Sequence, residues 1–453
     1  MPERWREGLI VPILKKGDSK KCENYRGITL LNTSYKILTS LILRKLKIYT
    51  EPEFGEYQHG FRQGRSTIDA IYIRNQIIQK CYEKNIELQI LFIDFKQAFD
   101  SLKRQVVIED GKRLGIPNKI LRLIQRTMKD SRAAVFSSGE MSEKFEINKG
   151  VRQGDGLSAT IFNIAVEGVM RACNISGSII EKSVQIVAYA DDLAIIARDS
   201  RSLKETLLRV KTEATKRGLE INQEKTKYME IERRKRNDNI KEVEIGNFRF
   251  EKVENFKYLG SIINNKNERS IELKQRIQAG HKAYHKYKTF MKHNRISKNT
   301  KLRIYKTAIR PVVTYGAEAM CLTKKDEEIS NIFERKIMRR ISGPIKINEE
   351  EYRRLMNYEI EEMMKGESIV KIIKSQRIRW YGHVNRRKES SMLKRITKWR
   401  PDENRMRGRP KTRCEDQVIQ DLKSIGVNNW NNKLHNRREW RRIVEESKTH
   451  KKL

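Results

Sequence analysis

The chain has 453 residues, 97 of them lysine or arginine and 58 of them acidic, which gives a net charge of +39 and an isoelectric point near 10.0. This excess of positive charge favours a polyanionic partner, and nucleic acid is the first candidate. No apolar stretch reaches the length of about 20 residues that spans a bilayer, so no membrane partner is predicted. The opening MPERWREGLI lacks the apolar segment of a signal peptide, so we expect an intracellular protein that is not secreted, in the nucleus or the cytoplasm.

The predicted elements alternate between strands and helices up to residue 265 and are helical beyond it. Strands are predicted at 8–16, 87–95 and 256–264, and a β-hairpin at 183–199. Helices are predicted within 24–49, from Ser66 or Thr67 through Lys80, and over 159–173, 202–218, 270–293, 297–318 (interrupted at Pro311) and 323–342. The last of these begins with a capping-box pattern, Thr323-x-x-Asp326.

The end of the chain differs in charge from the rest. Residues 371–453 contain 25 lysines and arginines against 9 acidic residues, which predicts a separate basic module. Its aromatic residues suggest phosphate contacts combined with base stacking, although a solvated helical face is the alternative: Trp380, Tyr381, Trp399, Trp430 and Trp440. The five cysteines are scattered without a C-x-x-C pair, which indicates a reducing compartment and argues against a disulfide framework and a zinc knuckle. His383 with Cys414 supplies too few ligands for structural zinc.

Two adjacent acids interrupt the apolar run AYADDLAIIA (188–197), and a third acid follows the predicted strand at 87–95. Asp191 and Asp192 alone fit a surface turn equally well. If the fold brings Asp94 beside them, three carboxylates repel one another unless cations lie between them. Mg²⁺ prefers such oxygen ligands, and two ions about 3.5–4 Å apart stabilise an in-line phosphoryl displacement.

Six stretches in this order resemble the motifs of reverse transcriptases. They are HGFRQGRSTIDAI (59–71), FIDFKQAFDS (92–101), KGVRQGDGLS (149–158), YADD (189–192), GLEINQEKTKYM (218–229) and FKYLGSIIN (256–264). The first is similar to the fingers motif of the non-LTR (LINE-type) retrotransposon branch and its group II intron relatives. RIRWYGHVNRR (377–387) and RGRPKTRCEDQV (407–418) are similar to the ends of insect and other animal non-LTR elements. The amino-terminal endonuclease of complete elements is missing from this match.

The resemblance implies an α+β right-hand polymerase. We expect fingers at 1–86, a palm with a ferredoxin-like antiparallel sheet at 87–265, a helical thumb at 266–345 and a basic helical nucleic-acid-binding module at 346–453. The implied activity is that of an RNA-directed DNA polymerase, which extends a DNA primer on an RNA template with deoxyribonucleoside triphosphates. The implied cofactor is a pair of Mg²⁺ ions, with Mn²⁺ as a substitute.

The resemblance also implies a role for each matching residue. The catalytic metal ligands of the family match Asp94, Asp191 and Asp192. The Phe95 carbonyl matches an additional metal ligand. Phe99 matches the gate that faces the sugar 2′ position. Gln153 and Gly154 match the loop at the incoming nucleotide and the templating base, and Arg62 and Arg65 match fingers residues that hold the triphosphate. Lys225 matches a lysine that protonates departing pyrophosphate, and 256–261 the primer grip.

Each of these residues also has an ordinary structural interpretation. Phe99 fits a core aromatic residue, Arg62, Arg65 and Lys225 fit solvated charges, and Gln153 fits a loop residue. The family loop usually reads Q-G-D-P-L-S-P, whereas Gly156 and Ala159 stand here in place of the prolines. Because glycine does not fix φ as proline does, this loop is predicted to be looser. The alternatives to an active enzyme are a decayed RNA- or DNA-binding remnant and an RNA-dependent RNA polymerase, against which the bulk of Phe99 argues.

Overall fold

The computed structural model describes residues 1–15, 17–174, 179–180, 183–232, 240–348, 350–401, 413–451 and 453. Its contacts divide the chain into two compact units. Unit 1 comprises Met1–Ala70, Glu87–Glu230 and Lys235–Val253, and unit 2 comprises Ile71–Ile86, Ile231–Arg234 and Glu254–Leu453. The division falls within helix α3 (Thr67–Glu83). The predicted division into fingers, palm, thumb and terminal module stays a prediction.

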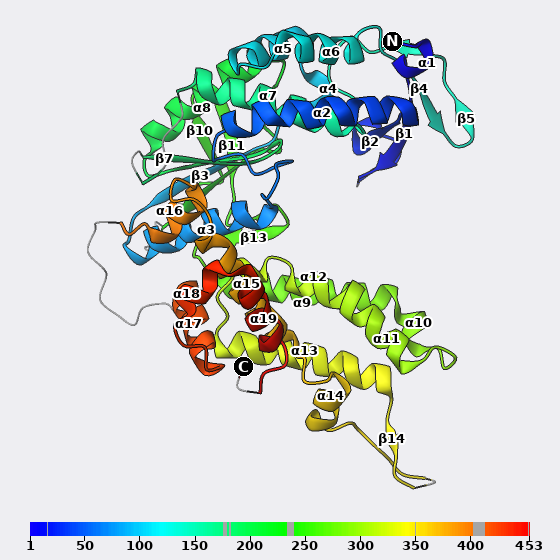
Figure 1. Cartoon of the computed structure of the whole chain (residues 1–453), viewed down its shortest axis with the longest axis vertical. Helices are drawn as coiled ribbons and strands as arrows, with labels where there is room; N and C mark the ends of the chain where they lie inside the picture. The colour runs from blue at the N-terminus through cyan, green and yellow to red at the C-terminus, as the bar shows by residue number, and fades with distance from the viewer. Residues whose placement is uncertain are drawn as a thin grey trace. The chain divides into compact units, whose positions relative to one another are not determined.

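The main sheet of unit 1 has six strands (Figure 1). In spatial order they are β10 (Glu242–Ile245), β11 (Phe248–Lys252), β9 (Lys227–Ile231), β3 (Leu88–Ile93), β8 (Asp192–Ala197) and β7 (Val184–Tyr189). Strand β8 pairs antiparallel with β3 on one side and with β7 on the other. Strand β3 confirms the predicted strand at 87–95, and β7 with β8 confirms the predicted hairpin at 183–199. Strand β3 reads LQILFI and is almost wholly buried, because helices cover the sheet.

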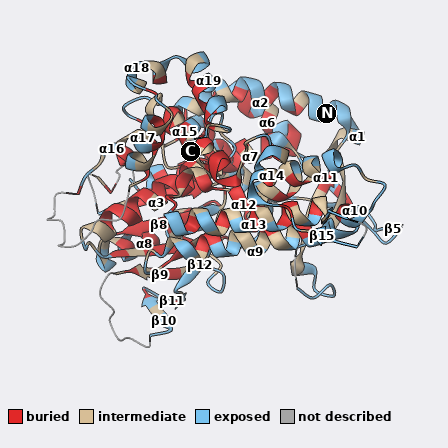
Figure 2. Cartoon of the chain, turned by 90° about the horizontal axis from the view of Figure 1, so that it is seen from below, coloured by how far each residue is buried: buried red, intermediate tan, exposed pale blue. Residues whose placement is uncertain are grey.

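A second sheet of unit 1 contains the first strands of the chain. Its strands are β2 (Tyr25–Leu30), β1 (Glu7–Leu14), β4 (Arg132–Ser137), β5 (Glu140–Met141) and β6 (Phe145–Glu146). The helices of unit 1 are α1 (Glu3–Arg6), α2 (Thr33–Glu53), α4 (Ala98–Ser101), α5 (Arg104–Arg113), α6 (Asn118–Met128), α7 (Gly156–Ala172) and α8 (Ser200–Lys216), with a 3₁₀ turn at Cys22–Asn24. Helix α7 is apolar along most of its length and is buried on nearly every face, so it forms the centre of the unit 1 core (Figure 2).

Unit 2 is mainly helical, as the sequence predicts for residues beyond 265 (Figure 1). Its larger helices are α9 (Arg269–Lys286), α13 (Lys324–Ser342), α15 (Ile369–Asn385), α17 (Cys414–Ser424) and α19 (Arg437–Ser447). The shorter ones are α10 (Lys288–Lys292), α11 (Lys298–Ile304), α12 (Arg310–Thr314), α14 (Asn357–Met363), α16 (Met392–Lys398) and α18 (Trp430–His435), with a π-helical turn at Tyr305–Ile309 and a 3₁₀ turn at Ala317–Ala319. Two short hairpins, β12 (Asn255–Tyr258) with β13 (Ser261–Asn264) and β14 (Ile345–Lys346) with β15 (Tyr352–Arg353), complete it.

Several predicted elements of unit 2 differ from the structure in detail. The predicted strand at 256–264 is a hairpin, β12 and β13, because Leu259 and Gly260 both adopt positive φ and reverse the chain. The predicted interruption at Pro311 is present: the π-helical turn precedes Arg310, the first residue of α12. The capping box of Thr323 and Asp326 is confirmed, since each side chain accepts a hydrogen bond from the other residue's backbone N–H.

The predicted basic module shares its core with the helices that precede it. One apolar cluster joins residues of α9, α13 and α15, so it extends across the predicted boundary at 345/346. A second cluster contains Tyr381 and Trp440, and the Trp440 indole donates to the Ile378 carbonyl over 3.1 Å. The prediction that these two rings stack on bases is therefore wrong, because both are buried in the protein core. The first half of the predicted motif at 407–418, residues 407–412, lies outside the described residues.

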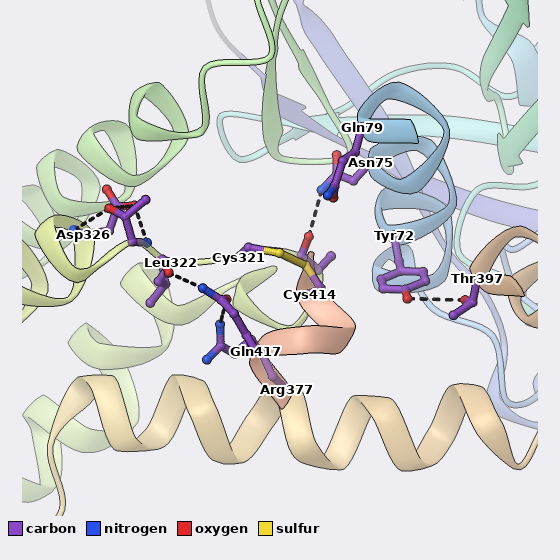
Figure 3. The surroundings of a disulfide bond; sticks show 12 residues. Tyr72, Asn75, Gln79, Cys321, Leu322, Asp326, Arg377, Thr397, Cys414 and Gln417 are labelled. Atoms are coloured by element: carbon purple, nitrogen blue, oxygen red, sulfur yellow. Dashed lines mark hydrogen bonds between the residues drawn. A yellow bond between two sulfur atoms is a disulfide. The ribbon is translucent and has the colours of Figure 1, made fainter. Parts of the chain in front are cut away.

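The cysteine prediction also needs a correction. Cys321 and Cys414 form a disulfide with Cα atoms 5.1 Å apart, although 93 positions separate them (Figure 3). Gln417, one turn into α17, donates to the Leu322 carbonyl over 2.5 Å beside the bridge. Cys22, Cys81 and Cys173 form no disulfide. The spacing of the cysteines could not predict this disulfide, because only the tertiary structure brings the two segments together. Among the described helices, none combines the length and the apolar character that crossing a bilayer requires.

Candidate active site

The three predicted metal ligands lie at one end of the main sheet of unit 1. Strands β3 and β8 pair in antiparallel register up to Ile93 and Leu193, and Asp94 and Asp192 are the next residues on either side. Strands β7 and β8 end at the pair Tyr189 and Asp192, so Ala190 and Asp191 form a two-residue hairpin turn. The register of three strands thus brings together acids that are far apart in the sequence.

The electrostatics of the three carboxyl groups show this proximity. Burial raises the pKa of Asp192 to about 6, and the charges of Asp191 and Asp94 add to the rise. Burial also raises the pKa of Asp94, which Lys225 opposes and Asp191 reinforces. For Asp191, burial raises the pKa, and hydrogen bonding to a backbone N–H and the charge of Arg26 oppose the rise. A cluster of partly buried acids whose charges disfavour one another is a typical site for cations.

A large open cavity of about 1960 Å³ in unit 1 is lined by these acids. Of the ten residues predicted for the site, eight line it: Asp94, Phe95, Phe99, Gln153, Gly154, Asp191, Asp192 and Lys225. The carboxylate oxygens are the donor type that hard divalent cations prefer. Among the described residues, no group of three or more His, Cys, Asp or Glu side chains is arranged to hold a metal ion.

Lys225 is held in place relative to Asp94 through the backbone. The Asn222 N–H donates to the Asp94 carbonyl over 2.8 Å, and the Asn222 side chain accepts from the Lys225 N–H over 3.3 Å. The ammonium of Lys225 lowers the pKa of Asp94, against the larger effect of burial. This turn therefore keeps a positive charge beside the acids.

Phe99 both lines the cavity and packs against the core. Its ring stacks on Phe162 of α7 with centroids 4.7 Å apart. Gln153 donates from its side chain to Asp100 over 2.9 Å, and its carbonyl accepts from the Thr29 N–H over 2.6 Å. Gly154 has φ of +125°, and a Cβ there would lie 2.5 Å from the Thr29 carbonyl oxygen. The Gln153–Gly154 loop thus requires glycine at its second position because it passes close to β2.

Arg62 and Arg65 do not appear among the described residues that line the cavity. The Arg62 guanidinium donates to the Glu51 carboxylate over 3.1 Å and to the Gly55 carbonyl over 2.7 Å, and its side chain is 6% exposed. Arg65 forms an ion pair with Glu56 and is 10% exposed. Both arginines thus have protein partners, and their triphosphate-binding role stays a prediction.

Two basic residues that we did not predict face the acids instead. Lys15 lies directly after β1, and Arg26 pairs with Ile13 across the β1–β2 hairpin. Both line the cavity, and the charges of both lower the pKa of Asp191, against the larger effect of burial. The only local signal was a basic residue on each side of the loop that joins β1 to β2, which is weak in a chain with 97 lysines and arginines.

The family model for reverse transcriptase (RNA-dependent DNA polymerase) matches residues 13–263. A Pol polyprotein from the type-1 retrotransposable element R2 of Popillia japonica is 25% identical over 50% of this chain and 32% of its own length. The RNA-directed DNA polymerase from the mobile element jockey of Drosophila melanogaster is 24% identical over 76% of this chain and 38% of its own. A transposon-derived protein of Caenorhabditis elegans is 26% identical over 58% of this chain and 95% of its own.

Among solved structures, telomerase from Candida tropicalis covers 87% of this chain and 69% of its own, with 13% identity and a TM-score of 0.45. The chain spans about a third of the length of the R2 and jockey proteins. The matched family region contains every predicted site residue, and the relatives come from retrotransposable elements, as the motifs predicted. The sheet and helices fit the predicted right-hand polymerase fold. The chain belongs to the reverse transcriptase family.

Proposed function

We propose that this chain is an RNA-directed DNA polymerase that extends a DNA primer on an RNA template. The observation that supports this function best is the meeting of Asp94, Asp191 and Asp192 at the end of β3 and β8, inside a cavity that also contains basic side chains. Carboxylates beside cationic groups suit a substrate that is a metal-bound triphosphate. The substrates would be deoxyribonucleoside triphosphates.

In this proposal the acids hold two Mg²⁺ ions, for which Mn²⁺ can substitute. Bound there, the ions would lower the pKa of the primer hydroxyl and stabilise charge on the leaving pyrophosphate. Asp94 and Asp192 would hold the ions from adjacent strands, Asp191 from the turn, and the Phe95 carbonyl would add a ligand. Lys225 would donate a proton to the departing pyrophosphate, since it lies beside Asp94.

The remaining residues of the cavity would orient the nucleotide. Lys15 and Arg26 would contact the triphosphate, because they already face the acids. The same role for Arg62 and Arg65 requires that they first release Glu51 and Glu56. Phe99 would exclude a 2′-hydroxyl, and Gln153 with Gly154 would contact the nucleotide and the templating base.

The partners in this proposal are an RNA template and a DNA primer or target inside the cell. In unit 2, a basic hollow of about 600 Å³ fits a phosphate backbone; its lining includes Arg335, Lys336, Arg339, Arg340 and Arg354. Burial is the larger cause that lowers the pKa of Arg339, and the positive charges of Arg354 and Arg335 lower it further. An anionic ligand would offset the repulsion among these charges. Residues 256–261 would serve as the primer grip, and the fingers, palm, thumb and terminal module would lie at the predicted boundaries.

The decisive experiment is primer extension on an RNA template in Mg²⁺, with the purified chain and its Asp191→Asn variant. We expect the wild type to extend the primer with deoxyribonucleotides. In Asp191→Asn the extension rate should fall by two or more orders of magnitude, which corresponds to about 3 kcal/mol of transition-state free energy. RNA affinity should be nearly equal in both. Binding without extension by the wild type would instead identify a non-catalytic remnant, and extension with ribonucleotides alone would identify an RNA polymerase.

A further inference from the structure

The hairpin turn that carries the acids is held by a residue far from it in the sequence, and we propose that Gln58 is a positioning residue for Asp191 and Asp192. Gln58 is 2% exposed and does not line the cavity, so it acts through the turn and not on a substrate. The inference rests on the proposed function, because it concerns how the same turn is held for metal and nucleotide.

The turn has a backbone group that the hairpin itself leaves unpaired. The β7–β8 ladder ends at Tyr189 and Asp192, so the Ala190 N–H lies outside it. Ala190 is 5% exposed and has φ of +57°, a conformation that alanine rarely adopts. A buried N–H without an acceptor is unfavourable, so this turn needs an acceptor from elsewhere in the fold.

Gln58 supplies that acceptor. Its Oε1 accepts from the Ala190 N–H over 3.0 Å and from the Gly60 N–H over 2.8 Å. Because both neighbours are N–H donors, only the carbonyl oxygen of the side chain can occupy this position. The side chain therefore links two backbone segments at a fixed distance.

The backbone around Gln58 is fixed against the same hairpin. The His59 N–H donates to the Ala188 carbonyl, and the Ala188 N–H donates to the Tyr57 carbonyl, each over 2.9 Å. These bonds form a short parallel bridge between Gln58 and the edge strand β7. The segment is thus paired with β7 at a single position, two residues before Ala190.

Close packing at Gly60 makes this support specific. A Cβ at Gly60 would lie 2.4 Å from the Ala190 nitrogen, a backbone atom that cannot move aside without moving the turn. The Asn163 side chain, from the buried helix α7, donates to the Gly60 carbonyl over 2.9 Å. Helix α7 therefore holds residues 58–60, and residues 58–60 hold the turn.

The consequence for the acids follows from their positions. Asp191 is the second residue of the turn and Asp192 is the first residue of β8, so a change in the Ala190 backbone reorients both carboxylates. In Gln58→Leu the Ala190 N–H would lose its acceptor while the volume of the side chain is nearly kept. The metal-binding oxygens should then occupy a wider range of positions.

The test compares Gln58→Leu with Gln185→Leu. Gln185 is a matched control because it is 1% exposed, lies on β7 away from the turn, and also binds two backbone groups, at Ile186 over 2.7 Å and Ile179 over 3.3 Å. Mn²⁺ affinity is measured by electron paramagnetic resonance, without nucleic acid, and kcat and KM for a deoxyribonucleotide are measured at saturating Mg²⁺. Thermal melting of both variants reports the loss of stability.

We expect Gln58→Leu to weaken Mn²⁺ binding about fivefold or more and to lower kcat about tenfold, with KM changed by less than about threefold. Gln185→Leu should lower the melting temperature by a similar amount and leave Mn²⁺ affinity and kcat within about twofold. If Gln58→Leu does not fold, Gln58→Met takes its place, because it lacks the carbonyl oxygen and its sulfur is only a weak acceptor.

Equal Mn²⁺ affinity and equal kcat in the two variants would overturn the role of Gln58. A wild-type chain that fails to extend primers, combined with a loss of Mn²⁺ affinity confined to Gln58→Leu, would contradict the proposed function and still support Gln58. Extension by the wild type combined with identical behaviour of the two variants would contradict Gln58 alone.

Discussion

Asp110 and Arg217 form a two-point ion pair inside unit 1, with Nε to Oδ2 at 2.7 Å and Nη2 to Oδ1 at 2.9 Å. Both side chains are 2% exposed, and the pair joins α5 to the end of α8. A Cβ at Gly168 of α7 would lie 2.3 Å from the Asp110 carboxylate, so the glycine permits three helices to meet at this pair. Neither Asp110 nor Arg217 lines the cavity, so the pair serves the fold.

Removing Asp110 should be costly, because the buried Arg217 guanidinium would lose both of its short contacts with Asp110 and keep only Glu213 as an ionic partner. We expect Asp110→Ala to lower the free energy of unfolding by about 3–5 kcal/mol in urea denaturation. Glu244→Ala, which removes the exposed pair of Glu244 with Arg249, should change it by less than about 1 kcal/mol. If both variants lose a similar amount of unfolding free energy, the buried Asp110–Arg217 pair stabilises the fold no more than an exposed ion pair does.

Gly156 offers a stabilising substitution at one of the positions where this chain departs from the family loop. It is the first residue of α7, Asp155 before it has φ of −104° and ψ of 129°, and a Cβ at Gly156 would meet only Leu43, at 3.6 Å. Proline suits the first helical position and an extended residue before it. Gly156→Pro should raise the free energy of unfolding by about 1 kcal/mol. A lower denaturation midpoint would show that the loop needs the freedom of glycine.

Phe99 should affect both sugar selection and stability. Its ring lines the cavity beside Asp94 and also stacks on Phe162. In Phe99→Val we expect ribonucleotide incorporation to rise sharply while deoxyribonucleotide incorporation changes little, because a steric block is removed. The lost stack should lower stability by about 1–3 kcal/mol. Phe162→Leu is the control, since it also disrupts the stack but leaves Phe99 in place. If Phe99→Val lowers the melting temperature but leaves sugar selection unchanged, Phe99 has only a structural role in the core.

His59 should make unit 1 sensitive to acid. Burial first, and the charge of Arg65 second, lower its pKa from 6.5 to about 3, and neither ring nitrogen has a hydrogen-bond partner in the structure. At pH values between about 3 and 6.5, His59 binds a proton in the unfolded chain but not in the folded chain. The free energy of unfolding therefore falls as the pH falls through this range. The slope from this group approaches about 1.4 kcal/mol per pH unit.

His59→Phe should remove that slope, because phenylalanine fills a similar volume and does not titrate. Urea denaturation at pH values between 4 and 7 measures the difference from the wild type. His293→Asn, at an exposed histidine, should leave the wild-type slope unchanged. Parallel curves for the wild type and His59→Phe would contradict the prediction.

The disulfide of Cys321 and Cys414 should stabilise unit 2 under oxidising conditions. It closes a loop of 93 positions, which in the chain-entropy model corresponds to about 4–5 kcal/mol. We expect Cys321→Ser, or reduction by dithiothreitol, to lower the melting temperature of the chain, and the two treatments together to add nothing further. Cys22→Ser, at an exposed free cysteine, should have no effect. Equal melting of oxidised and reduced wild type would mean that the bridge does not constrain the unfolded chain.

The sequence by itself determined the local elements and the chemistry of the site. The apolar run before Asp94, the acids between two apolar strands and the capping box at Thr323 are local patterns, and local backbone preferences act over a few residues. Eight of the ten site residues that the motifs predicted line one cavity.

Only the tertiary structure decided which distant groups meet. The registers of β3, β8 and β7 place Asp94 beside Asp192, and the β1–β2 hairpin turns Lys15 and Arg26 towards the acids while Arg62 is bound to Glu51. The burial of Trp440 and the pairing of Cys321 with Cys414 depend in the same way on how helices pack. A charge, an aromatic ring or a thiol has no periodicity that reveals its partner, because packing between distant segments selects that partner.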